Sequence, residues 1–168
     1  MLVVVRDGEV RGTFSEARVG NGSERAPQFS CYFTLKGKLD GEIARVTVQT
    51  PGEPAASAFL QLTPERARLQ VESNQPGCAA TSGDMADEPY EVSRDSGGED
   101  WMSVALIATS AAVIRSAPGP RTRAIHRLGR GDAVAIRSRK GDWVEVVWPF
   151  GEYGISGWIE ERVLAEPK

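Results

Sequence analysis

Two cysteines and a single histidine are the side chains of this 168-residue chain best suited to covalent chemistry. A thiol beside an imidazole can act as a nucleophile, so a thiol-dependent enzyme working through Cys31 and His126 is one hypothesis. Cys31, however, lies in the apolar stretch QFSCYF, and a mid-strand position among aromatic residues favours inert burial. A lone histidine without nearby cysteine ligands supplies no metal site, so neither a metal nor a cofactor is predicted.

The two cysteines also permit one disulfide. Cys78 follows the turn Gln75-Pro76-Gly77, and a bond to Cys31 would close a loop of about 48 residues. In an oxidising compartment it would stabilise the fold by roughly 3–4 kcal/mol. Two free cysteines are the alternative, and spacing along the chain does not choose between them.

The sequence does not decide the cellular compartment of the protein either. The first ten residues, MLVVVRDGEV, are too short and too soon charged for a signal peptide. The chain as given is expected to be cytoplasmic, or periplasmic or extracellular if it is a mature form. No apolar run approaches the roughly 20 residues that cross a bilayer, so no membrane span is predicted.

Motifs of the common enzyme classes are missing from the sequence. Asp40 and Glu42 form a carboxylate pair, but they flank a predicted turn with no sign of a shielded cleft. No phosphate loop, dinucleotide fingerprint or nucleophile elbow is present. We therefore expect a protein without enzymatic activity.

Aromatic residues are concentrated near the C-terminal end, where Trp143, Trp148, Phe150, Tyr153 and Trp158 fall within sixteen residues. Trp158 is expected in a core, whereas Trp148, Phe150 and Tyr153 border a Pro/Gly loop and are expected to be partly exposed. Exposed aromatic rings beside arginines form an adhesive surface for peptides, glycans or proteins. The predicted binding residues are Arg115, Arg121, Arg123, Trp148, Phe150 and Tyr153.

Charge is unevenly distributed along the chain. Residues 1–100 carry 10 basic and 16 acidic side chains, a net charge of −6, and residues 101–168 carry 10 and 7, a net charge of +3. An acidic linker beside a basic rim suggests either attraction between these two parts of the chain or a basic face offered to an anionic partner. Two ordinary solvated surfaces are the alternative. Its bases are not interleaved with aromatic residues in a nucleic-acid motif, so no nucleic-acid partner is expected.

Short apolar runs separated by Gly- and Pro-containing turns predict an all-β chain. About six strands are expected before residue 73, with a turn over Gly37–Gly41 and a bulge near Ala44. Phe29, Cys31, Phe33 and Leu35 should share one face at a period of two. The continuous apolar run Met102–Ala108 predicts a strand with both faces covered or one continuing from the linker.

We expect two small domains: an antiparallel β-barrel or sandwich over residues 1–92 and a second barrel over 101–168. The acidic stretch SRDSGGED gives a linker over 93–100.

Residues 104–164 resemble a bacterial SH3-like (SH3b-type) domain. The matching elements are, in order, Val113-Ile114-Arg115-Ser116-Ala117-Pro118, Leu128 to Asp132, Gly141-Asp142-Trp143-Val144, Gly157-Trp158-Ile159 and Leu164. The first turn differs from the usual Leu-Asn-Val-Arg, and Pro149 to Ser156 is a long insert. The resemblance implies an SH3-like barrel that acts as a binding module. The first domain loosely resembles the small barrels of bacterial lysozyme inhibitors, in strand pattern and cysteines only.

These observations favour a non-enzymatic bacterial binding protein that recognises a protein, peptide or cell-wall ligand of the peptidoglycan type. The loops around Arg115–Arg123 and Trp148–Tyr153 would form its binding face, with a second surface at Gly20–Gln28. An immunity or inhibitor protein that blocks a toxin or cell-wall hydrolase is the alternative. Fold alone does not decide between them, and the sequence does not specify the oligomeric state.

Overall fold

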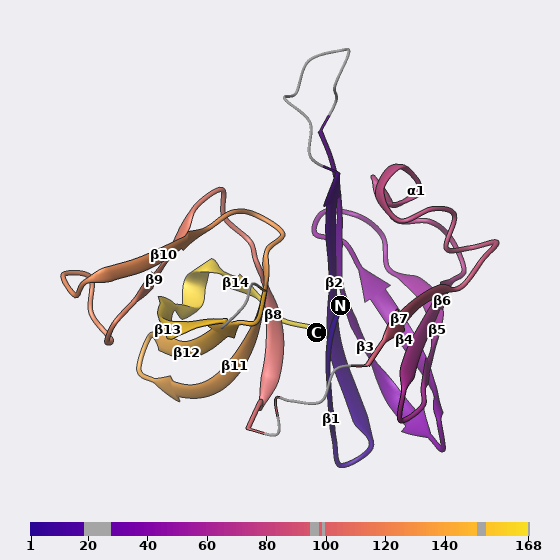
Figure 1. Cartoon of the computed structure of the whole chain (residues 1–168), viewed down its shortest axis with the longest axis horizontal. Helices are drawn as coiled ribbons and strands as arrows, with labels where there is room; N and C mark the ends of the chain where they lie inside the picture. The colour runs from indigo at the N-terminus through magenta and orange to yellow at the C-terminus, as the bar shows by residue number, and fades with distance from the viewer. Residues whose placement is uncertain (19–27, 95–97, 99, 151–153, 168) are drawn as a thin grey trace.

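The chain folds into two antiparallel seven-stranded sheets (Figure 1). A computed structural model describes residues 1–18, 28–94, 98, 100–150 and 154–167. The helices described are α1 (Cys78–Thr81) and the 3-10 turn η1 (Glu161–Val163). The predicted all-β class is thus confirmed. No helix in the described ranges is long and apolar enough to cross a bilayer.

The first sheet is a meander in which each strand pairs with the next along the chain. Its strands are β1 (Leu2–Arg6), β2 (Glu9–Arg18), β3 (Phe29–Asp40), β4 (Ile43–Gln49), β5 (Ala56–Leu62), β6 (Arg66–Val71) and β7 (Tyr90–Ser93). The six predicted strands are found, and a seventh, β7, is added beyond the range in which strands were predicted.

One face of this sheet carries the first hydrophobic core. Cys31, Phe33 and Leu35 are buried there as the period-two pattern predicted, whereas Phe29 lies exposed at the strand end. The turn predicted over Gly37–Gly41 is wrong, because Leu39 packs against the core and β3 stays paired with β4 as far as Asp40.

The predicted bulge near Ala44 is also wrong. Pairing of β4 runs without a register shift on both sides. Ile43 is out of phase with Val46 and Val48 because it lies on the opposite face of the sheet, where 54% of it is exposed.

The second sheet curls around its own core in the order β10-β9-β13-β12-β11-β8-β14. Its strands are β8 (Ser103–Ile107), β9 (Ala112–Arg115), β10 (Ala124–Leu128), β11 (Ala133–Lys140), β12 (Trp143–Trp148), β13 (Ile155–Glu160) and β14 (Leu164–Ala165). The chain leaves the first sheet at Ser93 and enters the second at Ser103.

Strand β8 has both faces buried, which confirms the prediction from its continuous apolar run. Ala105 and Ile107 point into the second core, whereas Val104 and Leu106 join a third cluster with Leu2 of β1. In this third cluster the two sheets pack against each other (Figure 1).

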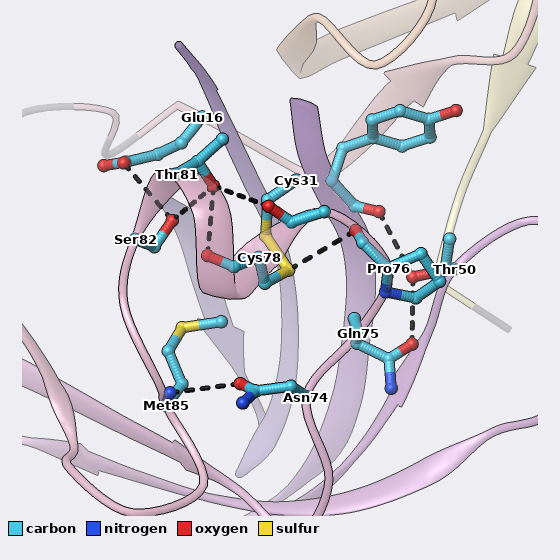
Figure 2. Close-up of a disulfide and its surroundings, with 12 residues drawn as sticks. Glu16, Cys31, Thr50, Asn74, Gln75, Pro76, Cys78, Thr81, Ser82 and Met85 are labelled. Carbon is cyan, nitrogen blue, oxygen red and sulfur yellow. Dashed lines mark hydrogen bonds between the residues drawn. A yellow bond between two sulfur atoms is a disulfide. The ribbon is translucent and has the colours of Figure 1, made fainter. Parts of the chain in front are cut away.

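A disulfide joins Cys31 of β3 to Cys78 at the start of α1, with the Cα atoms 4.6 Å apart (Figure 2). Gly77 makes this approach possible, because it has a positive φ of 78° and a Cβ there would lie 2.1 Å from the carbonyl oxygen of Ser30. Met85 is fully buried in the first core, and its backbone N–H donates to Asn74 Oδ1. The segment between β6 and β7 therefore covers part of that core.

Candidate functional site

The loop between β9 and β10 is held by two side chains from the loop and its flanks. Arg115 Nη1 donates to the carbonyl oxygen of Thr122 at 2.8 Å. The Thr122 hydroxyl lies 2.8 Å from the carbonyl oxygens of Ala117 and Gly119. Arg115, predicted as a ligand contact, thus positions this loop.

Three aromatic rings meet beside that loop. The His126 ring stacks on the Trp148 indole with centroids 5.0 Å apart and planes inclined by 28°. Phe150 meets the same indole edge-on, with centroids 5.7 Å apart. His126 and Trp148 are half-buried and 37% of Phe150 is exposed. We call these three residues the aromatic cluster.

The cluster forms because the second sheet curls. Trp148 shares a strand face with buried Val144 and Val146 and packs against the second core. His126 lies opposite buried Ile114 and therefore faces the same core from β10. The two rings close one end of this core, and their outer surfaces remain partly open to solvent.

The segment of chain that contains His126 is basic. Arg121, Arg123, Arg127 and Arg130 are all exposed. None of them forms an ion pair with a described residue. The nearby carboxylate of Asp132 accepts a hydrogen bond from the backbone N–H of Gly129 at 2.7 Å. Positive charge on the strand and loop that adjoin an open aromatic surface suits ligands that carry carboxylates.

The structure brings together only part of the predicted site. Trp148 and Phe150 are in contact, and Arg121 and Arg123 lie in the adjoining loop. Tyr153 lies outside the described residues. Trp158, expected in the core, is half-buried, because it stands on the β13 face opposite fully buried Ile159. Residues 19–27 of the predicted second surface are likewise not described.

The thiol–imidazole pair considered from the sequence is not assembled. Cys31 is fully buried in the first core with its sulfur in the disulfide, and His126 lies in the second sheet. Within the described part of the chain, no three His, Cys, Asp or Glu residues are arranged to hold a metal ion.

Sequence reasoning overlooked two members of the site. His126 was considered only as a catalytic group or a metal ligand, although its position in the alternating stretch AIHRL could have suggested a place at the rim of a barrel. Thr122 anchors the loop, and its position within SAPGPRTR is the signal that a Ser/Thr turn would give.

Comparisons of the chain with family models, with curated proteins and with solved structures gave no match.

Proposed function

We propose that this is a binding protein whose second sheet recognises a peptide that carries carboxylates. Such a peptide would be a segment of a protein or the peptide part of a cell-wall polymer. The observation that carries the proposal is the aromatic cluster, with Phe150 open to solvent beside exposed Arg121 and Arg123. Aromatic and arginine side chains dominate the affinity of protein interfaces.

The loop geometry supports a preformed site. Arg115 and Thr122 fix the loop by hydrogen bonds, so little conformational entropy is lost when a ligand binds. The arginines then steer and orient the ligand while the rings supply apolar contact. In this proposal the loop around Arg115–Arg123 and the exposed rings of Trp148 and Phe150 form a single binding face.

Co-sedimentation with purified peptidoglycan, together with anisotropy of a labelled acidic peptide, tests the proposal. Phe150→Ala and Arg123→Glu should each weaken binding by about tenfold. Phe29→Ala is the matched control, since this phenylalanine lies in the first sheet and, like Phe150, is 37% exposed. Absence of binding to both probes, or equal loss in the control, would reject this surface.

The outcome also separates the alternative function. A stoichiometric complex with one folded toxin or cell-wall hydrolase, disrupted by Phe150→Ala, would identify an inhibitor or immunity protein instead.

A further inference from the structure

The face of the first sheet opposite its core, which we call the outer face, gathers most of the positive charge of this half of the chain. Pairing of all seven strands runs without a register shift, so directly opposed residues share a face. By that register the outer face holds seven of the ten basic side chains of residues 1–100, namely Arg6, Arg11, Lys36, Lys38, Arg45, Arg66 and Arg68.

Among the acidic side chains in the described part of residues 1–100, only Glu9, Asp40 and Glu91 stand on the outer face. Seven basic against three acidic groups give this face a net charge of +4, although residues 1–100 as a whole carry −6. Such segregation concentrates a positive potential on one surface.

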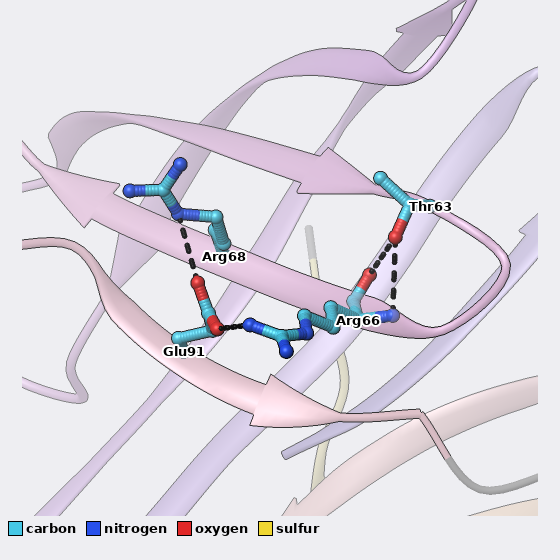
Figure 3. A network of polar contacts seen from close by, with 4 residues as sticks. All are labelled: Thr63, Arg66, Arg68 and Glu91. Carbon is cyan, nitrogen blue, oxygen red and sulfur yellow. Dashed lines mark hydrogen bonds and ion pairs between the residues drawn. The ribbon is translucent and has the colours of Figure 1, made fainter.

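Two of these acids are already paired. Glu91 accepts from Arg66 and Arg68, which reach it from the same strand (Figure 3). Glu9 accepts from Lys36 at 3.3 Å and Arg11 at 3.2 Å, and these hydrogen bonds hold the pKa of Glu9 below its usual value. Lys38 and Arg45 form no ion pair with a described residue.

The centre of the outer face combines basic side chains with exposed apolar ones. Lys38 stands opposite Arg45, and Arg45 stands opposite Phe59. The Arg45 guanidinium lies 5.4 Å from the centroid of the Phe59 ring. Phe59 is 50% exposed, and Ile43 on the neighbouring strand is 54% exposed. Arginine over an open aromatic ring beside an exposed aliphatic side chain is the composition of an interface centre.

One part of the outer face is already an interface. Leu2 and Val4 of β1 pack against β8 and β11 in the cluster between the sheets. Next to this contact lies a groove of about 680 Å³, lined by Arg11 and Lys38 from the outer face and by Met102 at the entry to β8. The basic surface thus adjoins the contact between the two sheets.

We propose that the outer face binds an acidic protein segment bearing an apolar side chain, with Lys38 and Arg45 contacting its carboxylates and Ile43 and Phe59 its apolar group. A protein segment suits the surface better than nucleic acid, because Ile43 cannot stack on a base. A nucleic acid also carries a charge on every nucleotide and would meet the carboxylates of Asp40, Glu9 and Glu91, whereas a peptide can place apolar residues opposite them. This surface is separate from the aromatic cluster.

A labelled short peptide in which glutamate alternates with leucine is the probe, used with the full chain. Its affinity and the chemical shift of the Ile43 δ1 methyl group are measured together. Arg45→Glu and Phe59→Ala should each weaken binding by about tenfold. Arg18→Glu, at an exposed strand end on the other face, should leave binding unchanged.

Two further probes test the apolar contact and the class of partner separately. A glutamate–serine peptide that binds as tightly would contradict the apolar contact, and an oligothymidylate that binds more tightly would contradict a protein partner. No shift of the Ile43 methyl, or a Kd that Arg45→Glu does not raise, would also overturn the proposal.

Discussion

The rings of His126 and Trp148 stack on each other at one end of the second core, with their centroids 5.0 Å apart. They come from strands β10 and β12, which are not neighbours in the sheet order. Only the curl of the sheet brings them together. The same contact therefore closes the core and builds the surface on which the proposed function rests.

Loss of the disulfide should destabilise the first sheet. Replacing Cys31 and Cys78 together by alanine removes a link between residues 47 apart in the sequence, and the free energy of unfolding should fall by about 3–4 kcal/mol. Denaturant unfolding measures this. Hydrogen exchange should show that amides of α1 and its flanking turns lose protection while those of the second sheet do not. A uniform loss of protection in both sheets would contradict the assignment.

Gly131 should be intolerant of a side chain because it lies in the contact between the sheets. A Cβ at Gly131 would approach the Tyr32 ring to 2.6 Å, whereas a Cβ at Gly141 would meet nothing within 4 Å, and both glycines have positive φ. Gly141→Ala thus reports backbone strain alone. Thermal unfolding should show a clearly larger loss for Gly131→Ala, by about 1–3 kcal/mol, and equal losses would argue against this contact.

Thr13→Val should stabilise the protein. The Thr13 hydroxyl is fully buried, and no described residue forms a hydrogen bond with it. Removing a buried hydroxyl without a partner should raise the free energy of unfolding by about 1 kcal/mol. Thr34→Val is the matched control, because that hydroxyl donates to the Gln49 carbonyl oxygen, and it should give no gain. Denaturant midpoints of the wild type and the two variants measure this. A midpoint for Thr13→Val that is no higher than that of the wild type would contradict the prediction.

Stability should fall at alkaline pH through Tyr90. Burial, followed by the hydrogen bond to Glu16 and the charge of that carboxylate, raises the pKa of Tyr90 from 10.0 to about 12. A raised pKa in the folded state favours folding below pH 10, and this contribution is lost as the pH rises from 10 to about 12. Unfolding free energies across this window should fall more steeply for the wild type than for Tyr90→Phe. Parallel curves would contradict the pKa assignment.

The sequence predicted most of the strands because their burial is local in origin. Alternation placed Cys31, Phe33 and Leu35 on the core face, and the continuous apolar run predicted the doubly buried β8. The predictions of the turn over Gly37–Gly41 and of the bulge near Ala44 failed because packing and strand pairing with residues far away in the sequence determine the structure there. Leu39 extends β3 because it packs against the first core. Ile43 lies on the outer face because its neighbour Ala44 takes the core-facing position on β4.

Contacts between the sheets could not be inferred from local patterns. The continuous apolar run Leu2 to Val5 suits a strand with apolar contacts on both faces, but nothing in it identifies Val104 of the other sheet as a partner. The site was predicted in part for the same reason. Trp148 and Phe150 were found by composition, whereas the partnership of Trp148 with His126 depends on the curl of a sheet across non-adjacent strands.

The most direct test of the proposed function is a titration of ¹⁵N-labelled full chain with soluble peptidoglycan fragments and with a short carboxylate-bearing peptide. The Trp148 indole N–H, the Phe150 amide and the Arg123 amide should shift together and saturate with one of these ligands. Largest shifts that fall away from the aromatic cluster and its loop, or no shift with either ligand, would contradict the account.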